Sequence, residues 1–194
     1  VGGDIVMDGE PIDVQSAEDA IRSGMALVPE DRKQQGLILE MTVRENLGLA
    51  TLKKESHKGM FLNETREDEI TTQMIEQMRI KTPSSCQVVR YLSGGNQQKV
   101  VLGKWLAMEP KVLLLDEPTR GIDVGAKQEI FGLMEDLAGR GVAILFVSSE
   151  LEEVMGMSDR ALVMHEGRIT GELLRDQLSE EAIMQLATGS TEAA

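Results

Sequence analysis

Uninterrupted runs of apolar residues mark three positions along the chain. They read Met-Ala-Leu-Val at residues 25–28, Val-Leu-Leu-Leu at residues 112–115 and Val-Ala-Ile-Leu-Phe-Val at residues 142–147. Apolar runs without alternation are typical of strands that are covered on both faces, as in a parallel sheet. We therefore expect a strand at residues 25–28 and buried strands at residues 112–115 and 142–147, with a helix over residues 130–137 crossing back over the sheet.

Shorter signals predict the outer parts of the fold. An Asp-Gly turn inside residues 5–12 and a Glu-Gly turn inside residues 160–171 predict two hairpins. Ser16, Thr42 and Ser179 each stand where a hydroxyl can cap a helix, and a glutamate three residues after Thr42 completes a capping-box pattern.

The middle of the chain combines a polar segment with an apolar stripe. Residues 53–59 are predicted to be a mobile loop, and a helix is expected to begin at Asn63 or Thr65. Its apolar positions recur at i, i+4 and i+8, which predicts one buried helix face. These positions are Ile70, Met74 and Met78.

A serine, two glycines and three amides open another predicted helix. Residues 92–99 read Leu-Ser-Gly-Gly-Asn-Gln-Gln-Lys. Ser93 can cap the helix, and Gly94 and Gly95 lack a Cβ, so a phosphate oxygen can approach the backbone closely. The unpaired N–H groups and the positive end of the helix dipole favour an anion there. An ordinary capped helix after a glycine turn is the alternative reading of an isolated Ser-Gly-Gly.

Two adjacent carboxylates end the central apolar run. Asp116 and Glu117 follow residues 112–115, and Pro118 stops the strand. Ligands of parallel sheets gather at the carboxyl ends of the strands, so these side chains are candidates for chemistry. Acids at strand ends also cap helices or pair with surface arginines, and Asp-Glu-Pro alone does not decide between these roles.

The two motifs together, with the second beginning thirteen residues after Lys99, resemble those of the ATP-binding cassette (ABC) family. The resemblance implies an α/β fold of the P-loop NTPase type, with a parallel core sheet, antiparallel edge strands and a small helical subdomain. It implies that Asp116 holds Mg2+ through water and that Glu117 polarises the attacking water as general base. Asp123 stands in the family's D-loop and would bridge to a partner domain, a role compatible with capping the next helix.

Members of this family sandwich ATP between two cassettes. The resemblance therefore implies that the signature of this chain acts in trans, on nucleotide held by a second cassette in the same polypeptide or in a homodimer. The signature residues implied to bind nucleotide are Ser93, Gly94, Gly95, Asn96 and Gln97.

One expected motif is missing from the sequence. No Gly-x-x-x-x-Gly-Lys-[Ser/Thr] occurs, and Gly103-Lys104 lies inside the predicted signature helix. The chain opens at Val1 without an initiator methionine, so we expect a fragment truncated before the P-loop. Because the lysine for the β- and γ-phosphates and the magnesium hydroxyl are then absent, we expect this chain alone not to hydrolyse ATP.

Two further departures narrow the resemblance. Glu30 stands at the Q-loop position in place of an amide, and Ser149 stands at the switch position, where a serine cannot carry the proton of an imidazole. With Val-Pro-Glu-Asp-Arg-Lys at residues 28–33 and Phe-Val-Ser-Ser-Glu-Leu-Glu at residues 146–152, the chain resembles the second, degenerate cassette of bacterial monosaccharide importers of the ribose, xylose and galactose type.

That resemblance implies an ATPase subunit that energises sugar import. Its partners would be transmembrane permease subunits and, indirectly, a periplasmic sugar-binding protein. The subunit would lie peripherally on the cytoplasmic face of the bacterial inner membrane. The methionine stripe is expected to pack in the core, and the alternative is a helical subdomain surface pressed against a membrane subunit.

Length and composition favour one partial ABC domain. At 194 residues and 41% hydrophobic content the chain can bury one core. We expect residues 1–47 and 100–175 to form the core, residues 48–99 to form the helical subdomain with the signature at its end, and residues 176–194 to form a C-terminal helix and tail.

Charge and cysteine content exclude other classes. A net charge of −13 without a basic stripe disfavours nucleic-acid binding. The single cysteine, Cys86, cannot form an internal disulfide and suits a reducing compartment, and two histidines without ligand spacing argue against a zinc site. No apolar run approaches about 20 residues, so no membrane-spanning helix is expected.

Two alternative functions stay open. The chain could be a soluble ABC protein that acts on ribosomes or DNA, against which its acidic balance argues. It could also be a scaffold cassette that no longer supports hydrolysis. Loss of ATPase activity after substitution of Ser93 would separate the importer from the scaffold.

Overall fold

The computed structural model describes residues 3–52, 56–57, 61–62 and 64–189. The chain divides into two compact units, the first ending at Val147 and the second beginning at Ser148. Each unit has its own secondary structure and is described by itself.

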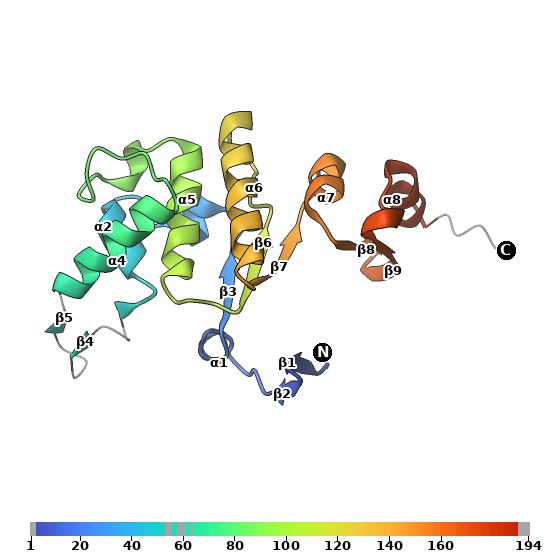
Figure 1. Ribbon diagram of the computed structural model, residues 1–194, viewed down its shortest axis with the longest axis horizontal. Helices are drawn as coiled ribbons and strands as arrows, with labels where there is room; N and C mark the ends of the chain where they lie inside the picture. Colours follow the sequence, from blue (N-terminus) through green and yellow to red (C-terminus); the bar gives the residue numbers. More distant parts are fainter. Residues whose placement is uncertain (1–2, 53–55, 58–60, 63, 190–194) are drawn as a thin grey trace. The chain divides into compact units, whose positions relative to one another are not determined.

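A three-stranded parallel sheet forms the centre of the first unit (Figure 1). Its strands are β3 (Met25–Val28), β6 (Val112–Asp116) and β7 (Ala143–Val147), in the order β3-β6-β7. The register places Val28 beside Leu115. All three predicted strands are therefore confirmed, and so is the parallel α/β class of the fold.

Burial differs between the two faces of this sheet. Helix α5 (Gly94–Leu106) contacts β3, and helix α6 (Val124–Gly139) contacts β7. On one face Leu113 and Leu115 are buried, whereas on the opposite face Leu145 is 58% exposed. Leu27 and Val147 are likewise exposed. The prediction of a buried strand at residues 142–147 is therefore wrong, whereas no residue of β6 is exposed. An apolar run specifies strand type but not the element that covers the strand.

Helices α2 (Val43–Gly48) and α4 (Glu64–Gln77) pack against each other and against α5 (Figure 1). The predicted stripe lies on the buried side of α4 and just beyond its end. Its members Ile70, Met74 and Met78 are 8%, 4% and 0% exposed. Core packing of the methionines is thereby confirmed.

Local capping explains where the short helices begin. Ser16 accepts a hydrogen bond from the Asp19 amide at the start of α1 (Ala17–Arg22). Thr42 and Glu45 form a reciprocal capping box at the start of α2, as their spacing predicts.

Two small antiparallel pairs of strands also belong to the described part of the first unit. Strands β1 (Ile5–Met7) and β2 (Glu10–Ile12) pair around Asp8 and Gly9, both of which have positive φ, as a type I′ turn requires. Strands β4 (Ser56–His57) and β5 (Phe61–Leu62) form the second pair. Two residues of the predicted loop at 53–59 are thus strand, and the rest of that loop lies outside the described residues.

The second unit is a hairpin with three short helical segments. Helix α7 (Leu151–Met157) precedes strands β8 (Arg160–His165) and β9 (Arg168–Leu174), which pair around the predicted Glu-Gly turn. A single helical turn, η3 (Arg175–Gln177), leads to α8 (Glu180–Ala187). Ser179 caps α8 as predicted, by accepting from the Ala182 amide.

Candidate functional site

The signature segment begins helix α5 with an exposed serine. Ser93 has extended backbone angles, and its Oγ accepts from the Asn96 amide at 3.4 Å. Ser93 is exposed and Gly94 is half-buried. The first-turn amides of α5 lack helical partners and therefore form an electropositive end that can bind an anion.

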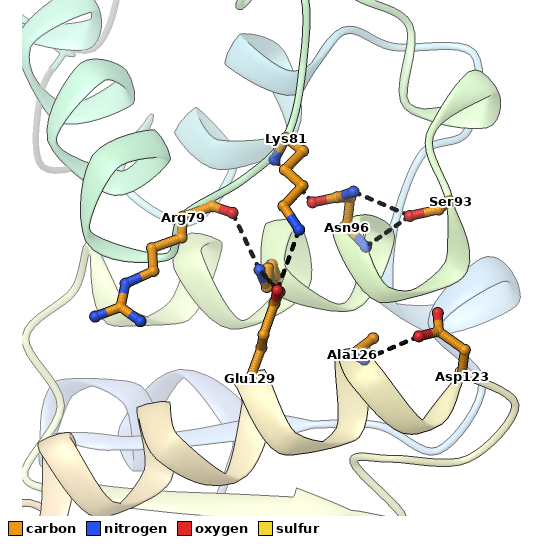
Figure 2. Close-up of polar contacts among 8 residues, drawn as sticks. Arg79, Lys81, Ser93, Asn96, Asp123, Ala126 and Glu129 are labelled. Atoms are coloured by element: carbon orange, nitrogen blue, oxygen red, sulfur yellow. Dashed lines mark hydrogen bonds and ion pairs between the residues drawn. The ribbon is translucent and has the colours of Figure 1, made fainter.

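Asn96 orients the hydroxyl of Ser93 (Figure 2). The Lys81 amide donates to Asn96 Oδ1 at 2.8 Å, and Asn96 Nδ2 donates to Ser93 Oγ at 2.9 Å. Because the oxygen of the Asn96 amide already accepts from Lys81, its nitrogen faces Ser93. Ser93 Oγ receives two N–H groups, which leaves its own O–H to donate elsewhere.

The beginning of α6 lies beside the beginning of α5 (Figure 2). Asp123 caps α6 by accepting from the Ala126 amide at 3.0 Å. Gly95 is buried, and a Cβ at this position would overlap the Cβ of Ala126. Glycine at this position therefore lets the two helices approach, and it brings the capping residues Ser93 and Asp123 to the same end of the helix pair.

An ion pair fastens the two helices one turn further on. Lys99 Nζ lies 2.5 Å from Glu129 Oε2 and 3.0 Å from the Arg79 carbonyl, and Lys99 is 1% exposed. Lys81 Nζ lies 3.1 Å from Glu129 Oε1. Hydrogen bonds from Lys99 and then Lys81, together with their charges, hold the pKa of Glu129 below its usual value.

The two carboxylates of the second motif lie at the carboxyl end of β6. Asp116 is the last residue of the strand, and both Asp116 and Glu117 are half-buried. Glu117 has a left-handed φ of 46°, and its amide donates to the Val147 carbonyl at 3.0 Å. A positive φ at a non-glycine residue is uncommon and occurs often at functional sites.

This carboxylate pair fits one class of metal ion. Within the described parts of the chain, no three histidine, cysteine, aspartate or glutamate side chains gather as a metal cage. Mg2+ is commonly held by one or two carboxylates while its other ligands are waters and substrate phosphates. Asp116 at a sheet end fits that requirement.

Other predicted site residues lie in different surroundings. Glu30 is exposed and forms an ion pair with Arg120. Gln97 is 4% exposed, and its Nε2 donates to the Val89 carbonyl at 3.1 Å, next to the helical turn η2 (Val89–Tyr91). The amide of Gln97 therefore supports α5 from its buried side.

Ser149 belongs to the second unit, where it is exposed just before α7. Its neighbour Ser148 accepts from the Glu150 amide at 3.1 Å and donates to Glu153 at 2.7 Å. Ser148 thus supplies the side-chain hydrogen bonds at the start of α7, next to the exposed Ser149.

Several polar residues of the site carry no local sequence signal. Examples are Lys81, Glu129 and Arg120. Each meets its partner only because distant segments come together, and in the sequence alone each is indistinguishable from an ordinary surface charge.

The described helices include none that is both long and apolar enough to cross a membrane. The geometry so far defines an α/β protein with a polar, anion-facing helix end and two carboxylates at the end of a parallel strand.

The family model described as "ABC transporter" matches residues 1–120. The chain belongs to the ABC transporter family.

Three relatives of this chain are named as sugar import ATP-binding proteins. The chain is 53% identical over 188 residues to the arabinose import ATP-binding protein AraG of Burkholderia pseudomallei strain K96243, a match that covers 96% of this chain and 37% of that protein. It is 51% identical to the ribose import ATP-binding protein RbsA of Geobacillus kaustophilus, with 96% of this chain and 38% of that protein covered. It is 54% identical to the xylose import ATP-binding protein XylG of Moorella thermoacetica, with 96% and 37% covered. The chain thus spans little more than a third of the length of these relatives.

Solved structures share the fold. A nucleotide-free ATP-binding cassette from an ABC transporter matches with a TM-score of 0.76 at 22% identity, over 95% of this chain and 76% of that one. The ATP-binding cassette MJ0796, in a dimeric post-hydrolysis state bound to ADP and Pi, matches with a TM-score of 0.72 at 22% identity, over 90% and 74%. At this identity the likeness establishes the ABC fold.

Proposed function

We propose that this chain is part of an ATP-hydrolysing subunit that energises import of a monosaccharide, and that its signature acts on nucleotide held by a second cassette. Relatives named as arabinose, ribose and xylose import ATP-binding proteins support the sugar-import role. The observation that carries the proposal is the Ser93 hydroxyl, which is exposed at the start of α5 and is arranged to donate.

In this proposal the signature binds a γ-phosphate in trans. The Ser93 hydroxyl and the amides of Gly94 and the first turn of α5 donate to the phosphate oxygens. Gly95 admits α6, Asn96 acts through Ser93, and Gln97 supports the helix from within. Binding of this kind stabilises the charge that develops on the transferred phosphoryl group.

The carboxylates at the end of β6 have separate roles in the proposal. Mg2+, when bound, neutralises phosphate charge, and Asp116 would hold it through water. Glu117 polarises the attacking water and accepts its proton. Because the 194 residues include no P-loop motif, we propose that this chain alone does not hydrolyse ATP.

The remaining predicted residues connect the site to its surroundings. Glu30 stands at the Q-loop position, Asp123 would face the partner cassette from the D-loop, and Ser149 holds the switch position in a form that cannot transfer a proton as histidine does. The partner cassette would lie in the same polypeptide or in a homodimer. Closure of the two cassettes would drive transmembrane permease subunits that receive sugar from a periplasmic binding protein, with this subunit on the cytoplasmic face of the inner membrane.

The proposed organisation keeps a core at residues 1–47 and 100–175, a helical subdomain at residues 48–99 and a C-terminal segment at residues 176–194. In an importer the helical subdomain is the part that contacts the permease. Substitutions on the exposed side of α4 would then uncouple uptake from hydrolysis.

The test uses the complete protein, reconstituted with its permease subunits in proteoliposomes. ATPase activity and ATP-dependent uptake of labelled arabinose, ribose and xylose are measured for the wild type and for Ser93→Ala. We expect Ser93→Ala to lower kcat by at least about tenfold, the order expected for a lost transition-state donor.

A matched control is available in the second unit. Ser179 also caps a helix, accepting from the Ala182 amide at 3.2 Å, so Ser179→Ala removes the same kind of cap without touching the signature. Equal activity of the wild type and Ser93→Ala would favour the scaffold reading. ATP-dependent binding to ribosomes or DNA, without sugar uptake, would favour the soluble ABC protein.

A further inference from the structure

A single wide helical turn, η1 (Arg32–Gly36), begins two residues after Glu30 at the Q-loop position. Its first residue is preceded by Asp31, whose Oδ1 accepts from the Lys33 amide at 2.9 Å and the Gln34 amide at 3.1 Å. This cap fixes the beginning of the turn and the direction in which Arg32 leaves it.

The end of η1 is fastened to the signature helix. Lys104 Nζ, on α5, donates to the Gly36 carbonyl at 2.5 Å, and a Cβ at Gly36 would lie 3.0 Å from Val101 of the same helix. Lys104 is 7% exposed, and its burial lowers the pKa of its amine. The turn that carries Arg32 is therefore held against α5.

From this position Arg32 reaches the turn that leads into α6. Its Nη1 donates to the Arg120 carbonyl at 2.8 Å, and its Nη2 donates to the Gly121 carbonyl at 3.1 Å. Gly121 has a φ of 66°, which a residue with a Cβ adopts only with strain. A guanidinium offers two donors in a rigid plane, so it can hold two successive carbonyls in one orientation.

The same guanidinium also touches the beginning of α5. A Cβ at Gly94 would lie 2.8 Å from Arg32 Nη2 and 3.4 Å from the Gly121 carbonyl. Glycine at position 94 thus makes room for Arg32 between the signature and the turn that precedes Asp123. Arg32 therefore contacts both the signature, which the proposed function places on the nucleotide, and the turn before Asp123, which it places toward the partner cassette.

This placement is electrostatically unfavourable. A cation beside a helix N-terminus meets the positive end of the dipole, and burial lowers the pKa of the Arg32 guanidinium, although Asp31 partly offsets this effect. Among the described residues the buried Arg32 Nε has no hydrogen-bond partner. The helix dipole, the burial of the charge and the unpaired Nε all oppose stability, so stability alone does not explain an arginine at this position.

A second link joins the segment that carries Arg32 to the turn that leads into α6. Glu30, two residues before Arg32, forms an ion pair with Arg120. Both side chains are more than a third exposed, so this pair contributes little to stability. Arg120 neutralises the Glu30 carboxylate, which stands where an amide is expected. Of the two links to residues 119–123, the one through Arg32 is the more buried.

We infer that Arg32 is a positioning residue, which holds residues 119–123 against the beginning of α5 and so sets Asp123 relative to Ser93. The functional part of this inference rests on the proposed function. It assigns to η1 the task of coupling the Q-loop position to the D-loop and the signature.

The test compares Arg32→Lys with the wild type in the complete protein assembled with its permease subunits. Lysine keeps the positive charge but cannot hold two carbonyls in one plane. Amide hydrogen exchange is followed in a peptide that contains Arg120, whose amide donates to the Glu117 carbonyl at 3.1 Å. We expect the exchange rate in residues 119–123 to rise by at least about tenfold, the order for weakening a hydrogen bond to a charged group. We expect kcat to fall by a similar factor, while KM for ATP changes by less than about twofold.

Arg160→Lys serves as the matched control, because Arg160 forms an exposed pair with Glu172 at 2.9 Å in the second unit. Unchanged exchange in residues 119–123 for Arg32→Lys would overturn the inference, as would a rise spread evenly over the first unit, which indicates a general structural role. If the wild type is active and Arg32→Lys raises exchange only in residues 119–123 without changing kcat, the functional part of the inference is overturned. A wild-type assembly without ATPase activity would instead contradict the proposed function, and the exchange data would still decide the role of Arg32.

Discussion

The amine of Lys99 lies 2.5 Å from a carboxylate oxygen of Glu129, although Lys99 is 1% exposed. The pair joins the signature helix α5 to α6, one turn beyond the close approach of Gly95 to Ala126. A buried ammonium is costly unless it is paired and hydrogen-bonded, and here Glu129 and the Arg79 carbonyl both accept from it. Glu129 therefore compensates the buried charge and fastens α6 to α5.

Glu129→Gln should destabilise the protein markedly. The substitution removes the charge that compensates buried Lys99, and we expect a loss of about 1–3 kcal/mol in the free energy of unfolding, measured by urea denaturation of the complete protein. Asp8→Asn is the control, because Asp8 pairs with Lys111 on the surface and both side chains are more than 60% exposed. An equal effect of the two substitutions would show that the burial of Lys99 carries no cost.

The contribution of Glu129 should depend on pH in a defined direction. Its pKa is lower in the folded protein than its ordinary value, chiefly because Lys99 donates to it. The folded state therefore binds the proton less tightly, so this stabilisation is complete above about pH 4.3, the usual pKa of a glutamate, and is lost as the pH falls through the folded value. Unfolding free energies of the wild type and Glu129→Gln, measured from pH 7 downward, should converge at acid pH. A constant difference would contradict this account.

Gly95→Ala should push α5 and α6 apart. The added methyl group would overlap Ala126, and we expect a cost of about 1–3 kcal/mol, as for other overpacked contacts. Ala126→Gly in the same molecule removes the opposing methyl group and should restore much of both stability and ATPase activity.

A glycine on α6 provides the control for this substitution. A Cβ at Gly132 would meet nothing within 4 Å, so Gly132→Ala should stabilise the helix by about 0.5–1 kcal/mol. Failure of Ala126→Gly to rescue Gly95→Ala would mean that the overlap is not the cause of the damage.

Asn96→Asp should impair hydrolysis through Ser93. A carboxylate at this position accepts the Lys81 amide but has no N–H for Ser93 Oγ, so it draws the hydroxyl proton inward. We expect kcat of the assembled transporter to fall about as far as for Ser93→Ala. The double variant Ser93→Ala, Asn96→Asp should have the same kcat as Ser93→Ala alone, because both substitutions remove the same interaction. Multiplicative losses would show that Asn96 acts independently of Ser93.

Short-range patterns predicted the local structure well. The capping box at Thr42 and Glu45 and the cap at Ser93 lie where the sequence predicts them, since a cap depends on residues three positions apart. The burial of the methionine stripe follows equally from helical spacing. The coverage of the sheet could not be predicted in this way, because Leu145 and Leu115 belong to similar apolar runs and yet lie on differently covered faces.

The sequence by itself determined the strands of the central sheet, the caps at Ser16, Thr42, Ser93 and Ser179, and the order of the two motifs that define the ABC family. These features depend on neighbours along the chain, so a linear pattern is sufficient to specify them. Only the tertiary structure decided which charges meet. Lys99 pairs with Glu129, which lies 30 residues further along the chain. Arg32 donates to the carbonyls of Arg120 and Gly121 at separations of 88 and 89 residues. Such pairs form because the packing of α5, α6 and η1 brings segments that are far apart in the sequence into contact. No pattern of neighbouring residues specifies that packing.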